Sequence, residues 1–259
     1  MKVIIWVKMS KGNSNLFKNR ILLTRPLQDS IEMSKNISSE FEVFVAPLLE
    51  IKKVDYDLNL PDNFDIILFT SKNGIRYFQR SFIKESHLVF TIGNGTKDFA
   101  NKIGINKVIN IDGDTEKLKK KIVPYLKQNM KILHPTSISK NENLKNFFKN
   151  KKCDYFQLGC YTSKKSNKNK LIFKKFMKGF DNGIIIILSG RTAQSFKGEV
   201  KKLTLERHCE NKFVFLLSKK IKNELSGLKF RETFISKKPN EISLIQEIKN
   251  FQMRGYEIG

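Results

Sequence analysis

The sequence contains little cysteine, histidine, tryptophan or alanine, and these scarcities limit the chemistry open to the chain. Its 259 residues include three cysteines, three histidines, one tryptophan and three alanines. The cysteines, Cys153, Cys160 and Cys209, form no Cys-x-x-Cys pair, so we expect buried thiols in a reducing compartment rather than disulfides. The histidines lack the spacing of metal ligands, so we expect no metal site.

Long apolar runs are also missing. The longest, residues 3–7 and 184–188, have the length of a strand, whereas a membrane-spanning helix needs about 20 residues. The first run is too short for the apolar part of a secretion signal, and no small-residue cleavage site follows it. We therefore expect a cytoplasmic protein that has no membrane partner.

Acidic residues are scarce relative to basic ones, 25 against 49, which gives a formal net charge of +24. Of the basic residues 41 are lysine and eight arginine, and phenylalanine occurs 21 times, a composition that A/T-rich coding would produce. A nucleic-acid-binding protein would more often use arginine and concentrate it. Dispersed lysine indicates a solvated surface, a polyanionic ligand or both, and we expect no nucleic-acid partner.

Short apolar segments alternate with helical ones along the chain. The pattern predicts strands at residues 21–24, 41–46, 66–70, 88–92, 108–111, 132–134, 155–161, 184–188, 213–217 and 230–235. Ile184–Leu188 is an uninterrupted apolar run of the kind found in central parallel strands that are covered on both faces. Strands alternating with helices predict parallel α/β sheets, and residues 1–19 are predicted to be an N-terminal extension. Met9 is a second possible start within it.

Three pairs of segments repeat in the same order. Residues 65–78 align with 183–196 at a shift of 118, 90–100 with 215–225 at 125, and 20–24 with 131–135 at 111. The repeat indicates two similar units, produced either by duplication or by chance likeness between α/β segments.

Ligands of parallel sheets bind outside the carboxyl ends of the strands. Hydroxyls and exposed amides are predicted at these ends, in Thr24-Arg25-Pro26, Thr70-Ser71, Gly93-Asn94-Gly95-Thr96, Tyr161-Thr162, Ser189-Gly190-Arg191 and Ser218. They contain no histidine-centred triad, carboxylate pair or phosphate-binding loop, and Gly93-x-Gly95 lacks the third glycine of a dinucleotide site. Two interpretations remain: the hydroxyls cap helices, with Ser71 a predicted N-cap, or they bind carboxylates.

In these motifs the chain resembles the uroporphyrinogen-III synthase family over about residues 20–251. The resemblance rests on Leu23-Thr24-Arg25-Pro26, Pro47-Leu48, Asp65–Ser71, Gly93–Thr96, Tyr161-Thr162 and Ser189. It implies two similar parallel-sheet, flavodoxin-like α/β domains joined by a two-stranded linker, bilobal with an interdomain cleft. The first domain would be discontinuous, residues 20–48 plus 163–251, and the second inserted, residues 51–161, with crossings near 47–54 and 161–165.

The resemblance also implies an activity: a cofactor-independent lyase that cyclises hydroxymethylbilane to uroporphyrinogen III. Water is lost and ring D is inverted through a spiro intermediate, in a monomer that needs only its small-molecule substrate. The match implies that Tyr161 acts as a weak acid on the departing hydroxyl. An equally good interpretation is that Tyr161 is an aromatic residue of the linker that packs at the edge of a domain. The implied substrate-binding residues are Thr24, Arg25, Ser71, Gly93, Asn94, Thr96, Ser189, Lys212 and Lys220.

The sequence departs from the family pattern in two places. Ser218-Lys219-Lys220-Ile221 stands where a second Gly-x-x-Thr is usual, so Lys220 would replace a carboxylate-binding hydroxyl. Asn73 stands where some members carry arginine. The alternative is a non-catalytic two-domain binding protein for a small polyanion, which would not need Tyr161.

Overall fold

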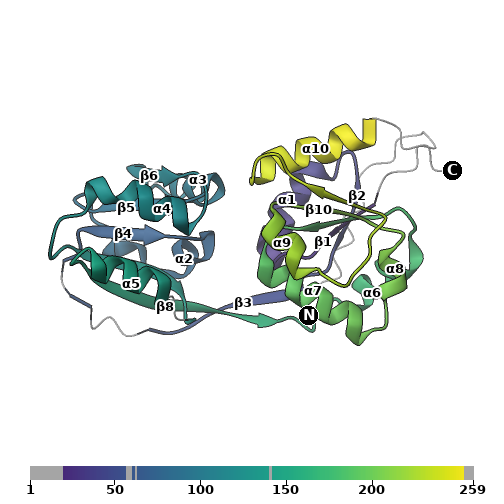
Figure 1. The fold of residues 1–259 in the computed structure, drawn as a ribbon, viewed down its shortest axis with the longest axis horizontal. Helices are drawn as coiled ribbons and strands as arrows, with labels where there is room; N and C mark the ends of the chain where they lie inside the picture. The colour runs from purple at the N-terminus through teal and green to yellow at the C-terminus, as the bar shows by residue number, and fades with distance from the viewer. Residues whose placement is uncertain (1–19, 57–59, 62, 140–141, 254–259) are drawn as a thin grey trace. The chain divides into compact units, whose positions relative to one another are not determined.

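The computed structural model describes residues 20–56, 60–61, 63–139 and 142–253 (Figure 1), so the predicted extension 1–19 lies outside the described residues. The chain divides into two compact units. Unit 1 contains the chain up to Glu50 and again from Lys164, and unit 2 contains Ile51–Ser163.

Unit 1 is built on a five-stranded sheet in the order β11-β10-β9-β1-β2, and every pair in it is parallel. Its strands are β1 (Arg20–Leu23), β2 (Glu42–Val45), β9 (Ile184–Ile187), β10 (Phe213–Leu216) and β11 (Glu232–Ile235). The four isoleucines of β9 are wholly buried at the centre, as predicted for an uninterrupted β-branched run. In chain order the strands run 2-1-3-4-5, a doubly wound α/β topology.

Helices cover both faces of the unit 1 sheet (Figure 1). They are α1 (Leu27–Ile37), α6 (Lys170–Gly179), α7 (Gly190–Lys202), α8 (Glu206–Cys209), α9 (Lys219–Glu224) and α10 (Glu241–Met253). Alternate residues of β9 face opposite layers: Ile185 and Ile187 pack with α6 to α9, and Ile184 and Ile186 pack with α1 and α10.

Unit 2 has a six-stranded sheet in the order β3-β8-β7-β4-β5-β6. The strands are β3 (Leu49–Lys53), β4 (Ile66–Phe69), β5 (Leu88–Ile92), β6 (Val108–Ile111), β7 (Lys131–Ser137) and β8 (Asp154–Lys165). The helices are α2 (Lys72–Tyr77), α3 (Asn94–Lys102), α4 (Thr115–Ile122) and α5 (Glu142–Asn150), with 3-10 turns η1 (Arg80–Phe82) and η2 (Val123–Tyr125). One face packs on α2 and α3, and the other packs on α4 and α5.

Strands β3 and β8 carry the chain from one unit into the other, because both unit boundaries fall within them. The Ser166 N–H donates to the Leu48 carbonyl at 2.9 Å, and the Val54 N–H donates to the Cys160 carbonyl at 3.1 Å. One partner moves forward along the chain as the other moves back, so the two strands are antiparallel. The remaining described strand pairs are parallel.

The two units repeat one strand order. The order β8-β7-β4-β5-β6 of unit 2 corresponds position by position to β2-β1-β9-β10-β11 of unit 1. The three sequence repeats fall on β4 and β9, on β5 and β10, and on β7 and β1. The internal repeat predicted from the sequence is therefore confirmed in the structure. After β3, the chain of unit 2 begins with β4, which corresponds to β9, the third strand of unit 1, and it ends with β7 and β8, which correspond to β1 and β2.

The apolar pattern did not predict α6, and it did not predict β3 either, which lies within the linker crossing near 47–54 that the family resemblance implies. The buried stripe of α6 consists of Phe173, Phe176 and Met177, which lie among four lysines. Helical spacing was present, but the four lysines that interrupt the apolar residues concealed it.

Gly74 provides a test of how tightly α2 packs on the sheet. A Cβ at this position would lie 2.4 Å from the Pro135 carbonyl oxygen of β7. Alanine usually favours a helix over glycine by about 1 kcal/mol, but here the clash with a backbone atom dominates. We expect Gly74→Ala to lower the free energy of unfolding by roughly 1–3 kcal/mol in denaturant titration.

Gly198 in α7 is the matched control. A Cβ there meets only the Lys165 Nζ, at 3.7 Å, an ordinary contact. We expect Gly198→Ala to raise the free energy of unfolding by about 0.5–1 kcal/mol. A stabilising effect of both substitutions would show that α2 can move away from Pro135 at little cost.

Candidate active site

Ser71 and Tyr161 meet in unit 2. Their hydroxyl oxygens are 3.0 Å apart, although the residues are separated by 90 positions in the chain. Ser71 follows β4 in an extended conformation, and its Oγ accepts a hydrogen bond from the Gly74 N–H at 3.2 Å. The predicted N-cap is thus confirmed, and the same hydroxyl also contacts Tyr161.

Tyr161 reaches Ser71 because β8 contains one extra residue. Thr136 of β7 pairs with Gly159, but Ser137 pairs with Tyr161, so Cys160 is left without a partner in the ladder. Before this bulge, Tyr155 packs toward α4 and α5, whereas Phe156 and Leu158 pack toward α2 and α3. Strict alternation would put Tyr161 on the side of Tyr155, and the extra residue returns it to the α2 side.

The surroundings of Tyr161 restrict its ring. Tyr161 is only 8% exposed, and the ring of Tyr77 lies beside it with centroids 6.0 Å apart. The Ser71 hydroxyl has one hydrogen, and since its oxygen already accepts from Gly74, that hydrogen can be donated to the Tyr161 oxygen. The phenol hydrogen of Tyr161 is then available to an oxygen atom of a ligand.

A second polar chain lies one residue away from Ser71. Thr70 Oγ1 is 2.9 Å from His134 Nε2, and His134 Nδ1 is 2.6 Å from the Tyr155 hydroxyl. Burial lowers the pKa of His134 to about 3 and raises the pKa of Tyr155, so both side chains are neutral at physiological pH. The network joins the end of β4 to β7 and β8, and Tyr155 places it on the face of the sheet that packs on α4 and α5, opposite to Tyr161.

His134 was missed in the sequence as a contributor to this region. It stands alone in an apolar strand, and only its position opposite Thr70 and Tyr155 reveals its role. The pairing of β7 between β4 and β8 was the information that the sequence did not supply.

Gly93, Asn94 and Thr96 form the start of α3. Gly93 has φ 80°, and no side chain caps this helix, so its first N–H groups are suited to an anion. Asn94 Oδ1 accepts from Asn110 Nδ2 at 2.7 Å, which fixes the loop, and Thr96 is buried. The Lys72 side chain lies over Gly95, adding positive charge beside the helix terminus.

Ser189 occupies in unit 1 the place that Ser71 has in unit 2. It follows β9 and caps α7, accepting from the Thr192 N–H at 3.2 Å, and its hydroxyl is 2.8 Å from Thr192 Oγ1. Ser218 likewise caps α9, so a serine fulfils the capping role where the second Gly-x-x-Thr is missing. Lys220 is exposed on α9.

Three further candidates in unit 1 have their polar atoms engaged or enclosed. Thr24 is fully buried and donates to the Ile186 carbonyl at 3.2 Å, and Arg25 Nη1 is 2.5 Å from Glu241 Oε2. Lys212 is 1% exposed and precedes β10, so it lies at the amino ends of the parallel strands, whereas Thr24 and Ser189 lie at their carboxyl ends. Burial lowers the pKa of the Lys212 ammonium.

Within the residues that the structure describes, no group of three or more histidine, cysteine, aspartate or glutamate side chains could hold a metal ion. In the same part of the chain, no helix has the length and apolar character needed to cross a membrane.

The sequence of residues 33–246 matches the family model described as Uroporphyrinogen-III synthase HemD. The chain belongs to the uroporphyrinogen-III synthase family. Members of this family are lyases that need no cofactor. No curated protein sequence matches the chain significantly.

Solved structures of the synthase family resemble the fold described above. The uroporphyrinogen-III synthetase of Helicobacter pylori has a TM-score of 0.60 at 16% sequence identity, covering 90% of this chain and 99% of that one. A mutant uroporphyrinogen III synthase of the extremely thermophilic bacterium Thermus thermophilus has a TM-score of 0.54 at 12% identity, covering 91% and 99%. At such identities the similarity establishes the two-domain α/β fold, and it leaves the roles of individual residues open.

Burial of neutral His134 predicts a specific pH dependence of stability. Its pKa is about 3 in the folded chain, while unfolded histidine titrates near about 6.5. As pH falls below that value, the unfolded state binds a proton that the folded state does not, so the free energy of unfolding drops by up to about 1.4 kcal/mol per pH unit.

We therefore expect the stability difference between wild type and His134→Gln to shrink as the pH is lowered from 7 toward about 4.5. Denaturant titrations of both proteins at several pH values measure it. The pKa of His87 is also lowered by burial, but His87 is present in both proteins and does not affect the comparison. Parallel pH profiles would show that water reaches and protonates His134 in the folded chain.

Proposed function

We propose that this protein cyclises hydroxymethylbilane to uroporphyrinogen III, with loss of water and inversion of ring D. Membership of the synthase family carries the proposal. The hydrogen-bonded pair Ser71–Tyr161 is the feature of the described chain that best suits the chemistry. No observation favours the alternative of a non-catalytic polyanion-binding protein.

In the proposed reaction, the Tyr161 phenol donates a hydrogen bond to the hydroxyl that leaves ring A. The C–O bond breaks as the phenol proton moves to the leaving oxygen, which departs as water and leaves an azafulvene cation. Ser71 stabilises the phenolate oxygen by donating its hydroxyl hydrogen to it. The phenolate then accepts the proton that the pyrrole system loses when aromaticity is restored.

Ring inversion requires positioning more than activation. The substituted carbon of ring D must attack the azafulvene carbon to give the spiro intermediate, and holding the two carbons together supplies much of the rate. The eight carboxylates of the substrate offer handles for this. We assign carboxylate contacts to the start of α3 at Gly93, Asn94 and Thr96, and to Ser189 and Lys220. The predicted substrate contact of Ser71 is replaced in this proposal by its hydrogen bond to Tyr161.

We leave Thr24, Arg25 and Lys212 out of the proposed contacts. The hydroxyl of Thr24 and the guanidinium of Arg25 already bind groups of unit 1, and Lys212 is enclosed. Their environments support structural roles in the first unit.

We further propose that the two compact units act as the two domains of such an enzyme, one discontinuous (residues 20–48 plus 163–251) and one inserted (residues 51–161). We also propose that the protein is a cytoplasmic monomer. Three buried cysteines that are free thiols support the reducing compartment. Light scattering of the purified chain at a defined concentration tests the oligomeric state.

The direct test supplies the purified protein with hydroxymethylbilane, oxidises the products and separates the porphyrin isomers. Uncatalysed ring closure gives the type I isomer, so we expect type III to predominate only when active protein is present. Formation of type I alone, at the rate of a protein-free control, would contradict the proposed function.

Replacement of Tyr161 by phenylalanine removes the phenol while keeping the ring. Since the hydroxyl leaves readily, we expect kcat to fall by about ten- to hundred-fold, toward the lower end of general-acid contributions. The type III product formed per unit time measures this effect.

Tyr125→Phe is the matched control, because Tyr125 is 41% exposed and its ring packs on Phe90 at 5.2 Å. We expect that variant to keep full activity. Equal activity of the Tyr161 and Tyr125 variants would remove Tyr161 from the mechanism and favour a simple packing role.

A further inference from the structure

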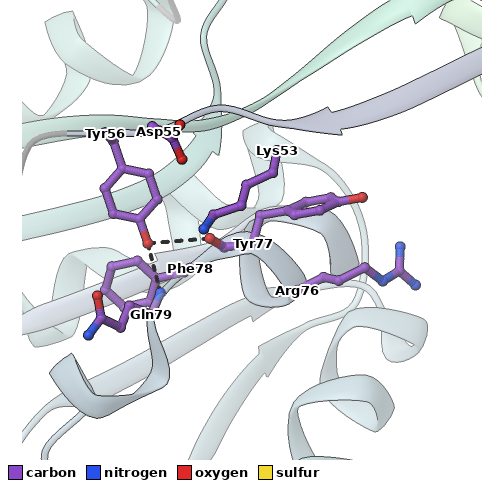
Figure 2. A pocket seen from close by; sticks show the side chains of 7 residues that line it. All are labelled: Lys53, Asp55, Tyr56, Arg76, Tyr77, Phe78 and Gln79. Atoms are coloured by element: carbon purple, nitrogen blue, oxygen red, sulfur yellow. Dashed lines mark hydrogen bonds between the residues drawn. The ribbon is translucent and has the colours of Figure 1, made fainter.

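Unit 2 contains a pocket of about 420 Å³ between the segment after β3 and the end of α2 (Figure 2). Its lining residues are Lys53, Asp55, Tyr56, Arg76, Tyr77, Phe78 and Gln79. The volume is near the lower end of the range for small-molecule sites, roughly 300–1,000 Å³, so the pocket suits one substituted ring rather than a chain of four.

The wall of this pocket is held in place by Tyr56. Its hydroxyl accepts from the Gln79 N–H at 2.8 Å and donates to the Tyr77 carbonyl at 3.3 Å, as Figure 2 shows. Burial raises the pKa of Tyr56, so the phenol stays protonated and both bonds persist. The phenol thereby fixes the segment after β3 to the residues that end α2.

The pocket carries charges of both signs. Lys53 and Asp55 are exposed, and neither has an ion-pair partner among the described residues. Arg76 is positioned by Asn73 Oδ1, 2.5 Å from its Nη1, and by the ring of Phe99, 5.1 Å from its guanidinium carbon. The guanidinium is directed away from Lys53 and Asp55, as Figure 2 shows. Lys53, Asp55 and the aromatic rings match a flat ligand that has both an anionic substituent and an N–H donor.

We propose that this pocket binds one carboxylated pyrrole ring of the substrate, with Lys53 on a carboxylate and Asp55 on its pyrrole N–H. The proposal rests on the proposed function and adds residues to it that no motif identified. Tyr77 connects the two places, since its residue lines the pocket and its ring lies beside that of Tyr161. A ring bound here is therefore connected through Tyr77 to the phenol of Tyr161, within the same unit.

Calorimetric titration tests the pocket without any turnover. The probe is a monopyrrole that carries one acetate and one propionate substituent, and its dimethyl ester is the uncharged control. We expect the dicarboxylate to bind the full chain with one-to-one stoichiometry, and Lys53→Met to weaken binding by about ten-fold, the value of one charge-assisted hydrogen bond.

Lys120→Met is the matched variant, because Lys120 is exposed on α4 of the same unit. It removes the same charge outside the pocket and should leave binding unchanged. Absence of probe binding, or equal binding by the Lys53 and Lys120 variants, would overturn the proposal whether or not the protein is active.

Steady-state kinetics with hydroxymethylbilane identify where the ring comes from. If the pocket binds a ring of the substrate, we expect Lys53→Met to raise KM by about ten-fold and to leave kcat largely unchanged, while Lys120→Met changes neither. If Lys53→Met weakens the probe but leaves KM unchanged, the pocket binds a free monopyrrole, and its assignment to the substrate is wrong. A wild-type chain that binds the probe yet forms no type III isomer would refute the proposed function and leave the pocket as a pyrrole site.

Discussion

One extra residue in β8 determines what Tyr161 can do. Cys160 has no partner on β7, and this single insertion moves the following side chain from the face of α4 and α5 to the face of α2. There it lies 3.0 Å from the Ser71 hydroxyl, whose oxygen also accepts a hydrogen bond from the start of α2. Bulges often re-aim a side chain next to a site of function, and this one supplies the only phenol that we assign to the chemistry.

The reaction assigned to the family depends less on acid–base groups than on how the substrate is positioned. The Tyr161 hydroxyl is hydrogen-bonded to an uncharged group, Ser71, and His134 on the other face of the sheet is kept neutral by burial. Tyr161 is instead held in position by the capping Ser71 and by the neighbouring ring of Tyr77, while the buried polar chain on the other face of the sheet fixes β7 and β8 to the end of β4. The lysine-rich surface also attracts a polyacidic substrate electrostatically. This attraction does not depend on the exact position of any single lysine.

Much of the fold could be predicted from the sequence because its signals are local. The apolar run at β9, the serine after β4 and the repeated strand–serine–helix pattern each depend on neighbouring residues alone. The bulge at Cys160, the pairing of His134 with Thr70 and the enclosure of Lys212 depend on which strands become neighbours, and no local pattern contains that information. The motif match reached Ser71 and Tyr161 separately, whereas their contact came from the register of β7 and β8.

The insertion of one unit inside the other has a consequence for synthesis on the ribosome. Every strand that unit 2 needs has emerged once the chain has been made as far as β8, whereas β1 must wait for β9, whose register joins Leu22 to Ile185. The first two strands of unit 1 are thus translated early and remain without a central partner while the inserted unit is completed. Their short length and the polar residues around them limit premature pairing with other nascent chains during that interval.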